Sequence, residues 1–365
     1  MILEKISLHN FRNLQRVFLE PSPAINILVG DNGQGKTNIL ESIYLLGTLS
    51  SHRTANDREM INWDKERAQV DVLLRKRDHS LKLTVTLEGS SKRVQVNDTP
   101  LEKKSEFIGN LNVVLFSPED LNLVKGGPSY RRDFLDIEVS QVSSYYHHLL
   151  NEYRHVLRQR NFYLKELKEN YKKDYGVLEI WDEKLIDLGS RIIEKRMEVI
   201  EKLQILARLN QRRITGGKEN LSIEYECSLG ELNADIYSIF RKVLVNNREE
   251  EVKRGYTLYG PHRDDLILKV NGIDIRKYGS QGQQRTSALA LKLAELEFMK
   301  SESGEYPVLL LDDVFSELDQ KRKDILLELI AGRIQTFITA TDLNIIGKLK
   351  HSDYKLFKVK QGFID

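Results

Sequence analysis

Eight consecutive residues near the start of the chain match the pattern G-x-x-x-x-G-K-[ST], and their surroundings limit what the chain can form. The eight, with Asn38 directly after them, are Gly30, Asp31, Asn32, Gly33, Gln34, Gly35, Lys36 and Thr37. An apolar segment from Ala24 to Val29 precedes the pattern, and apolar residues recur at helical spacing after it as far as Gly47. A strand, a glycine-rich loop and a helix in this order predict a phosphate-binding loop in an α/β fold.

The residue types in this loop suit a nucleotide with a bound Mg²⁺ ion. Glycines allow backbone conformations in which successive N–H groups point at phosphate oxygens. Lys36 can reach the terminal phosphates, and the Thr37 hydroxyl can complete an octahedral shell around Mg²⁺. The helix that follows presents its N-terminus to the same phosphates. A glycine-rich turn that fits the pattern by chance is the alternative, but it does not account for the strand and the helix on either side.

Composition narrows the class of protein. The 365 residues are 40% hydrophobic and 30% charged, which indicates a globular protein large enough for two lobes. The single cysteine, Cys227, excludes an intramolecular disulfide. We expect a cytoplasmic location, because the first residues lack a signal-peptide pattern and no apolar stretch is long enough to span a bilayer. Since 56 basic residues are nearly balanced by 54 acidic ones, any DNA-binding site must be a local patch.

The predicted secondary structure changes twice along the chain. Residues 1–99 are strand-rich, apart from the helix after the phosphate loop. Two long helical segments follow, Tyr130 to Tyr171 and Leu178 to Ile214. Short strands are predicted after them at Leu221 to Cys227, Tyr256 to Tyr259 and Leu266 to Val270, with a hairpin turn at Asn271-Gly272.

These elements predict two domains. We expect residues 129–215 to form an arm of antiparallel helices, inserted into a head built from residues 1–128 and 216–365. The phosphate loop lies in the first half of that head. The second half must therefore supply the rest of the site.

A second motif lies in that second half. The apolar run from Val308 to Leu311 ends in Asp312 and Asp313, which is typical of a parallel strand buried on both faces. Ligands gather at the carboxyl ends of such strands. Asp312 can hold Mg²⁺, directly or through water, and Asp313 can orient or deprotonate an attacking water. A core strand followed by an acidic turn is the alternative, which the phosphate loop disfavours. Residues Thr336 to Ala340 predict a neighbouring strand.

The segment Ser280-Gln281-Gly282-Gln283-Gln284 begins a predicted helix. Ser280 and Gln283 are spaced as a capping box, in which each side chain bonds to the backbone N–H of the other residue. A well-capped helix start is one sufficient interpretation. The other is that the free N–H groups of this helix N-terminus bind a second anion, because the helix dipole favours phosphate there.

Taken in order, these motifs resemble those of a known family. The phosphate loop, the helical insertion, the Ser-Gln-Gly-Gln segment, the Asp-Asp strand end and Ser316-Glu317-Leu318-Asp319 resemble ABC-type ATPase heads of the SMC class. Finer matches to the RecF family of bacterial recombination-mediator ATPases cover essentially the whole chain. They are Leu8-His9-Asn10-Phe11-Arg12-Asn13-Leu14, Phe116-Ser117-Pro118-Glu119-Asp120-Leu121, Gly126-Gly127-Pro128, Arg131-Arg132-x-Phe134-Leu135-Asp136 and Gly260-Pro261-His262-Arg263-Asp264-Asp265.

The resemblance implies a fold and roles for individual residues. It implies an ABC-type ATPase head, with a mixed or parallel sheet that carries the phosphate loop, and an inserted helical arm lobe. ATP and Mg²⁺ are the implied cofactors. Lys36 and Thr37 match the phosphate and metal ligands, Asp312 matches the metal carboxylate, and Asp313 matches the catalytic carboxylate. Arg12 matches a basic residue near the nucleotide phosphates.

The same resemblance implies a homodimer that forms with ATP. Ser280, Gly282 and Gln283 would contact the γ-phosphate of ATP bound to the partner subunit, and Asp319 would communicate across the dimer. Closure would clamp double-stranded or gapped DNA, and slow hydrolysis would release it. The implied function is ATP-dependent DNA binding in recombinational repair and replication-fork maintenance, where the protein helps to load recombinase on single-stranded gaps, with RecR as a partner.

Some positions depart from the usual ABC pattern. Asp313 stands where Glu is usual and is one methylene shorter, so we expect slow turnover. Thr341 stands where a switch histidine is usual, and the glutamine of a Q-loop is not evident near Phe116 to Asp120. For His262 to Asp265, a structural ion-pair corner and a functional role are both open.

Two other classes of protein use similar motifs. The nucleotide-binding subunit of a transporter shares the ATP sandwich but couples to a membrane subunit, so copurification with membranes would identify it. A small-molecule kinase uses an ordinary phosphate loop without a Ser-Gln-Gly-Gln segment. ATP-dependent dimerisation would separate a kinase from the ATP-driven DNA-binding protein that we expect.

Overall fold

The computed structural model describes residues 1–169, 175–233, 235–330, 332–342 and 353–364. The chain forms two compact units. Unit 1 consists of Met1–Asp120 and Lys292–Asp365, and unit 2 consists of Leu121–Leu291.

The first sheet of unit 1 is antiparallel and begins with the N-terminal strand. Its strands lie in the order β2-β1-β4-β5-β6-β7. They are β1 (Ile2–Phe11), β2 (Leu14–Leu19), β4 (Arg67–Arg75), β5 (Ser80–Glu88), β6 (Ser91–Val96) and β7 (Thr99–Pro100). Buried and more exposed residues alternate along β4, as expected for a sheet with one face on the core. The strand-rich start that the sequence predicts is confirmed.

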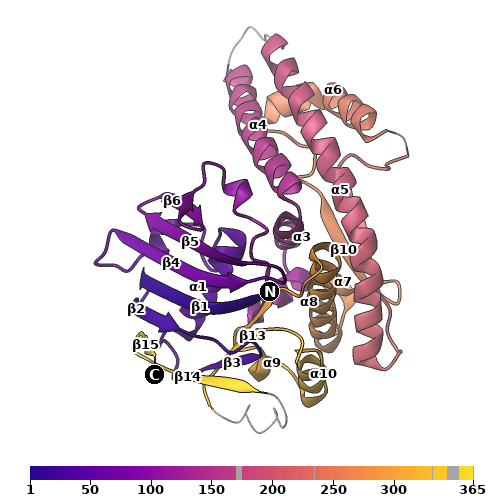
Figure 1. Ribbon diagram of the computed structural model, residues 1–365. Helices are drawn as coiled ribbons and strands as arrows, with labels where there is room; N and C mark the ends of the chain where they lie inside the picture. The colour runs from indigo at the N-terminus through magenta and orange to yellow at the C-terminus, as the bar shows by residue number, and fades with distance from the viewer. Residues whose placement is uncertain (170–174, 234, 331, 343–352, 365) are drawn as a thin grey trace. The chain divides into compact units, whose positions relative to one another are not determined.

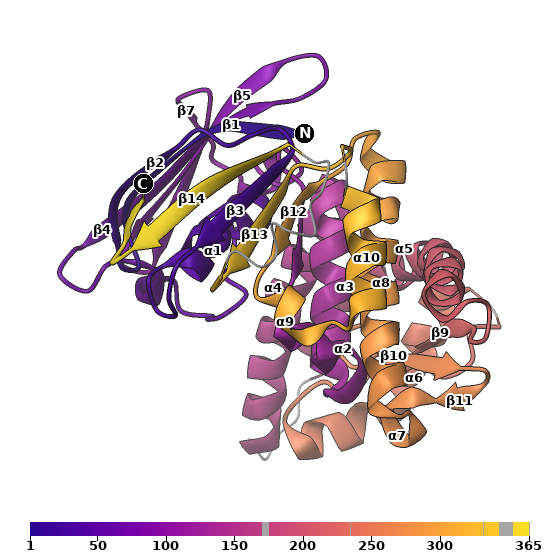
Figure 2. The ribbon, with the colours of Figure 1, turned by 90° about the horizontal axis from the view of Figure 1, so that it is seen from below.

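The second sheet of unit 1 carries the parallel strands (Figure 2). Its order is β15-β14-β3-β13-β12-β8. The strands are β3 (Ile25–Val29), β8 (Val113–Phe116), β12 (Val308–Leu311), β13 (Thr336–Ala340), β14 (Tyr354–Lys360) and β15 (Phe363–Ile364). All four residues of β12 are buried, and β12 pairs in parallel with both β13 and β8. The predicted doubly buried strand and its predicted neighbour are therefore confirmed.

Helix α1 (Lys36–Thr48) shares one apolar core with strands of both sheets. Ile39, Leu40 and Ile43 of α1 are fully buried in that core. The other helical elements in or entering unit 1 are η1 (Asp57–Met60), η2 (Lys104–Glu106), η3 (Pro118–Leu121), α8 (Gln281–Ser303), α9 (Val314–Glu317) and α10 (Gln320–Ile330). Helix α1 starts directly after the glycine-rich loop, so the packing of α1 fixes where that loop lies.

Unit 2 is built around two long helices, α4 and α5, with α6 packed on both (Figure 1). Its helices are α2 (Asn122–Lys125), α3 (Pro128–Val142), α4 (Ser144–Glu169), α5 (Gly176–Thr215), α6 (Ile236–Arg254), α7 (Ile275–Tyr278) and the first part of α8. Its strands are β9 (Leu221–Glu226), β10 (Asp265–Val270) and β11 (Ile273–Asp274). The two predicted helical segments are helical, with a break at Ser143, and residues 170 and 171 lie outside the described residues. The predicted hairpin turn joins β10 to β11, with positive φ at Asn271 and Gly272.

The extent of unit 2 differs from the predicted arm of residues 129–215. Unit 2 also contains 121–128 and 216–291. The physical reason is pairing after the long helices. Strand β9 packs on α5 and pairs antiparallel with β10, and α6 packs on α4 and α5.

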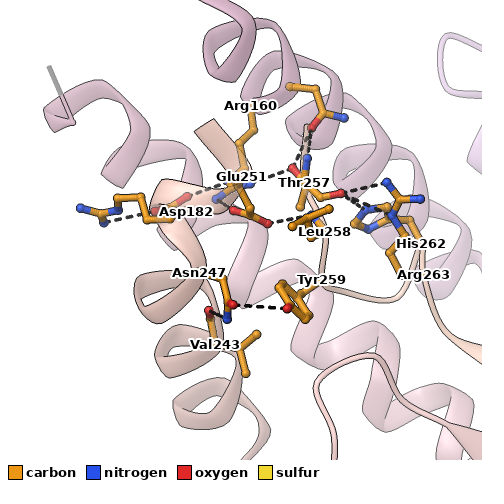
Figure 3. Close-up of polar contacts among 12 residues, drawn as sticks. Arg160, Asp182, Val243, Asn247, Glu251, Thr257, Leu258, Tyr259, His262 and Arg263 are labelled. Atoms are coloured by element: carbon orange, nitrogen blue, oxygen red, sulfur yellow. Dashed lines mark hydrogen bonds and ion pairs between the residues drawn. The ribbon is translucent and has the colours of Figure 1, made fainter. Parts of the chain in front are cut away.

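One predicted strand of unit 2 is wrong. Residues Tyr256 to Tyr259 form an irregular segment, because side chains take the place of a strand partner. The fully buried Arg160 donates to the Thr257 hydroxyl at 2.7 Å, and also pairs with Asp182 at 2.7 Å and Glu251 at 2.6 Å (Figure 3). Glu251 in turn accepts the backbone N–H of Leu258 at 2.7 Å. Such a buried network satisfies the backbone without a ladder.

Candidate nucleotide site

The glycine-rich loop joins β3 to α1 and has no room for side chains at two positions. A Cβ on Gly30 would lie 2.2 Å from the carbonyl oxygen of Val359, since β14 runs beside β3. Gly35 has a φ of 115°, a conformation that only glycine adopts readily, and it directly precedes α1. The loop is therefore held in shape by the neighbouring strand and by the start of the helix.

Lys36 is turned back onto this loop. Its ammonium group donates to the carbonyl oxygens of Gly30 at 2.5 Å and Asp31 at 2.8 Å, and the residue is only 8% exposed. Burial lowers the pKa of Lys36, while Asp313, Asp31 and Asp312 oppose that shift. A lysine held this way can exchange carbonyl oxygens for phosphate oxygens without a large movement.

A pocket of about 570 Å³ opens beside the loop. It lies at the carboxyl ends of β3, β12 and β13, where ligands of parallel sheets bind. It is lined by Asn13, Asn32, Gly33, Gly35, Lys36, Thr37, Asn38, His52, Arg53, Ser117, Pro118, Glu119, Asp312, Asp313, Thr339, Ala340 and Thr341. The pocket thus brings together the predicted loop residues and the predicted carboxylates from distant parts of the sequence.

The two residues expected to bind a metal touch each other in this pocket. The Thr37 hydroxyl donates to Asp312 Oδ1 at 2.9 Å. A hydroxyl and a carboxylate are hard oxygen ligands, and Mg²⁺ takes most of its other ligands from water and phosphate. The pair therefore fits Mg²⁺. No group of three or more His, Cys, Asp or Glu in the described parts of the chain could form an all-protein metal cage.

Asp313 begins the turn after β12. It has a φ of 51°, which is left-handed and uncommon for a residue with a side chain. Its side chain is exposed at the pocket, and its backbone N–H donates to the Thr339 hydroxyl at 2.9 Å. The carboxylate is therefore accessible to a water molecule and held by its backbone.

Two other predicted residues have local partners. Asp319 accepts the backbone N–H of Arg322 at 2.9 Å and pairs with that side chain at 2.6 Å, at the start of α10. Arg12 donates through Nε and Nη2 to Glu41 at 2.9 and 2.6 Å. Burial alone would raise the pKa of Glu41, but hydrogen bonds from Arg12 and Ser51 outweigh burial and lower it. The predicted roles of Arg12 at the phosphates and Asp319 across a dimer stay predictions.

The sequence reading missed a polar segment that reaches the pocket. His52 and Arg53 both line it, although they follow the far end of α1. Arg53, with a side chain 42% exposed, donates to Asn38 at 2.8 Å and pairs with the buried Glu41 at 3.4 Å. The only signal in the sequence is a basic residue soon after the loop helix. Thr341, at the position of the usual switch histidine, also lines the pocket.

The Ser-Gln-Gly-Gln segment belongs to unit 2. The predicted capping box is confirmed, with Ser280 N–H donating to Gln283 Oε1 at 3.0 Å and Gln283 N–H donating to Ser280 Oγ at 3.2 Å. Ser280 and Gly282 are exposed, and the Gln283 amide also donates to Glu219 at 3.1 Å. Whether this helix start also binds an anion stays a prediction.

The segment His262 to Asp265 forms an ion-pair corner within unit 2. Asp265 accepts both Nε and Nη2 of the buried Arg131, at 2.7 and 2.8 Å. Asp264 accepts the Ser228 N–H at 2.7 Å. Burial lowers the pKa of His262 to about 3, so its ring is neutral at physiological pH. Of the two open interpretations, these contacts favour the structural one.

Comparison with known proteins identifies the family of this chain. A family profile described as the RecF/RecN/SMC N terminal domain matches residues 2–365. Proteins named DNA replication and repair protein RecF match the whole chain. That of Halothermothrix orenii is 57% identical over 369 residues and is covered to 98% of its length. That of Alkaliphilus oremlandii is 46% identical over 370 residues and is covered over its whole length.

Solved structures give the same answer for the fold. Two structures of the recombination mediator protein RecF in the RecFOR pathway, RecF-ATPrS and RecF-ATP, have a TM-score of 0.92 at 39% and 38% identity. Each comparison covers all of this chain and 97% of the other. An Smc head domain from Pyrococcus furiosus, at 17% identity and a TM-score of 0.56, shares the fold alone. The predicted α/β ABC-type ATPase head with a helical insertion is confirmed. Among the described residues, no helix is long and apolar enough to cross a bilayer.

Proposed function

Because the chain belongs to the RecF family, we propose that it is an ATP-dependent DNA-binding protein of recombinational repair and replication-fork maintenance. In this proposal, ATP joins two copies of the chain around double-stranded or gapped DNA. Slow hydrolysis of ATP to ADP and phosphate then reopens the dimer. The clamp helps to load recombinase on single-stranded gaps.

One observation carries the proposal, which is the pocket that gathers Lys36, Thr37, Asp312 and Asp313. Thr37 and Asp312 are 275 residues apart in sequence and 2.9 Å apart in space. This is the arrangement that phosphoryl transfer needs, since such enzymes act mainly by positioning and by neutralising phosphate charge. The RecF-ATP and RecF-ATPrS structures of relatives support ATP as the ligand.

Each residue has a separate task in the reaction. Lys36 moves its two hydrogen bonds from loop carbonyls to phosphate oxygens. Thr37 and Asp312 would hold Mg²⁺, and the ion would neutralise charge on the phosphates. Asp313 orients the attacking water and accepts its proton. Because Asp is shorter than the usual Glu, the water is held less closely and hydrolysis is slow.

The one loop and the one Ser-Gln-Gly-Gln segment in each chain suit a twofold dimer. A twofold dimer pairs the loop of one copy with Ser280, Gly282 and Gln283 of the other, so that both nucleotides are enclosed. The exposed helix start offers N–H groups and a positive dipole end to the γ-phosphate. Closure therefore requires ATP, because only ATP supplies this phosphate.

DNA and RecR are the proposed macromolecular partners. The RecF relatives of known structure act in the RecFOR pathway, which supports both. With a net charge of only +2, the chain must bind DNA through a local patch that closure completes. Binding through phosphate contacts should weaken steeply with salt.

Sedimentation of two mutants, singly and mixed, tests the proposal. Lys36→Ala removes the phosphate cation, and Ser280→Arg fills the space for the partner's γ-phosphate. Each alone should stay monomeric with saturating ATP and gapped DNA. A heterodimer of the two retains one interface with a normal loop and a normal helix start, so the mixture should recover part of the ATP-dependent association.

The control is Ser303→Arg, an equal change at the other end of α8, which should dimerise as the unmutated protein does. Normal dimerisation of Ser280→Arg would overturn the role of the helix start. A wild-type protein that binds ATP but never associates, with or without DNA, would overturn the clamp.

A further inference from the structure

One hydroxyl group in the pocket bonds to both residues that follow β12. Thr339 lies on β13 and is only 4% exposed. Its hydroxyl oxygen lies 2.9 Å from Asp312 Oδ1 and 2.9 Å from the backbone nitrogen of Asp313. The register of the sheet explains this position, since Leu311 pairs with Ile338 and the next residue of each strand follows.

The number of protons and lone pairs on the Thr339 hydroxyl determines the direction of these hydrogen bonds. A threonine hydroxyl has one proton to donate and two lone pairs. The Asp313 N–H can only donate, so it takes a lone pair of the hydroxyl. The Thr339 proton then goes to Asp312 Oδ1, because the other acceptor within reach, the carbonyl oxygen of Leu311, is farther away at 3.5 Å.

These bonds determine which oxygen of Asp312 is available. Oδ1 accepts from two hydroxyls, Thr339 and Thr37, each at 2.9 Å. Oδ2 accepts no hydrogen bond from the described residues of the protein. The two hydroxyls therefore set the plane of the carboxylate and leave one oxygen for a ligand.

The same hydroxyl supports the unusual backbone of Asp313. With a φ of 51°, Asp313 occupies a region that most residues with a side chain avoid. Its N–H is held by Thr339, so the left-handed turn keeps one orientation. The direction in which the Asp313 side chain leaves the strand depends on that turn.

We propose that Thr339 is a positioning residue, which orients Asp312 for Mg²⁺ and Asp313 for the attacking water. The proposal rests on the proposed function, since it assumes ATP and Mg²⁺ in this pocket. Partners that hold a metal ligand in place typically contribute about 10–100-fold to metal affinity or activity. A change at Thr339 should therefore weaken Mg²⁺-dependent ATP binding and hydrolysis and leave the contacts of Lys36 with the phosphates intact.

The alternative is that Thr339 is only a buried threonine that needs a hydrogen-bond partner. Thr336 on the same strand gives a matched control for this alternative. It is fully buried, and its hydroxyl donates to the carbonyl oxygen of Ile334 at 3.0 Å. Replacing either residue by valine removes one buried hydroxyl and keeps the shape, but only one of the two touches the carboxylates.

The test compares Thr339→Val, Thr339→Ser and Thr336→Val. ATP affinity is measured with Mg²⁺ and with EDTA, and kcat and KM are measured separately. In Thr339→Val, the factor by which Mg²⁺ increases ATP affinity should fall about 10-fold or more, and kcat should fall about 10–100-fold. The affinity for metal-free ATP should be unchanged. Thr339→Ser keeps the hydroxyl and should restore both values to within about threefold. Thr336→Val should leave both unchanged.

Thr339→Ala guards against misfolding, because it removes the hydroxyl without placing a methyl group against the carboxylates, and it should behave as Thr339→Val does. The proposal is overturned if Thr339→Val keeps both its kcat and the increase in ATP affinity that Mg²⁺ gives. It is also overturned if Thr336→Val loses both equally, or if Thr339→Ser does not restore them. Failure of the proposed function looks different, since the unmutated protein would then show no ATP binding or no Mg²⁺ effect at all.

Discussion

Replacing Lys36 with methionine gives the most direct measure of what the glycine-rich loop does. Lys36→Met keeps the length and the apolar part of the side chain and removes the charge. Lys36 is only 8% exposed, and its ammonium group donates to two carbonyl oxygens of the loop. Its loss should therefore affect phosphate binding far more than folding.

The magnitude follows from the contacts of the ammonium group. It now donates two hydrogen bonds, at 2.5 and 2.8 Å, and we expect two phosphate oxygens to replace those acceptors. Because the two carbonyl hydrogen bonds are lost as the phosphate bonds form, the net gain is chiefly the attraction of opposite charges, which is about 4 kcal/mol at about 4 Å near a protein surface. Removing it corresponds to roughly a 10³-fold loss of ATP affinity.

Isothermal calorimetry with ATP and Mg²⁺ measures this loss, and urea unfolding measures stability. Lys92→Met is the matched control. Lys92 is another lysine of unit 1 with a largely buried side chain, 7% exposed, which donates to the carbonyl oxygen of Leu49 and pairs with Asp57 at 3.0 Å. It does not line the pocket that the described residues form. Lys92→Met should lower stability and leave ATP affinity unchanged.

Two outcomes would refute the reasoning. The first is a folded Lys36→Met protein that binds ATP within about threefold of the unmutated protein. The second is an equal loss of ATP affinity in both methionine variants, which would mean that general destabilisation of unit 1 causes the effect.

Two further predictions concern Asp313 and Asp120. Asp313→Asn removes the base but keeps Lys36, Thr37 and Asp312, so sedimentation should show a dimer that forms with ATP and persists, with phosphate release near background. Burial raises the pKa of Asp120 to about 6. The protonated form is thus favoured by folding, and its contribution to stability is complete below the unfolded pKa of 3.8 and lost as pH rises through about 6. Asp120→Asn stays neutral, so in urea unfolding it should equal the unmutated protein near pH 4 and exceed it above about pH 6.5; an unchanged difference across this range would contradict the assignment.

Much of the site could be predicted because its signals are local. The glycine-rich loop is contiguous, and the positions of Gly30 and Gly35 are set by the strand before it and the helix after it. The acidic pair after β12 could be placed for a similar reason, since an apolar run that ends in carboxylates indicates the carboxyl end of a parallel strand. Both predictions needed only the order of residues along one element.

The domain boundary and the failed strand at Tyr256 to Tyr259 depend on other information. Whether residues after Thr215 join the arm is decided by the pairing of β9 with β10, two strands separated by α6. The backbone N–H groups of Thr257 and Leu258 donate to the side chains of Asn161 and Glu251. A short apolar pattern cannot show that side chains from other helices will replace a strand partner.

Some residues of the pocket could not be predicted from the sequence. Their positions depend on how two strands pair and on where the chain folds back. Arg53 reaches the pocket only because the segment after α1 folds back along the helix to Asn38 and Glu41. Thr339 reaches Asp312 because Leu311 pairs with Ile338. A shift of one residue would put Ala340 there, and since side chains alternate along a strand, the hydroxyl would point to the other face of the sheet. The chemistry of Asp312 and Asp313 therefore depends on a pairing between two strands, and the measurements on Thr339 and Thr336 test that dependence directly.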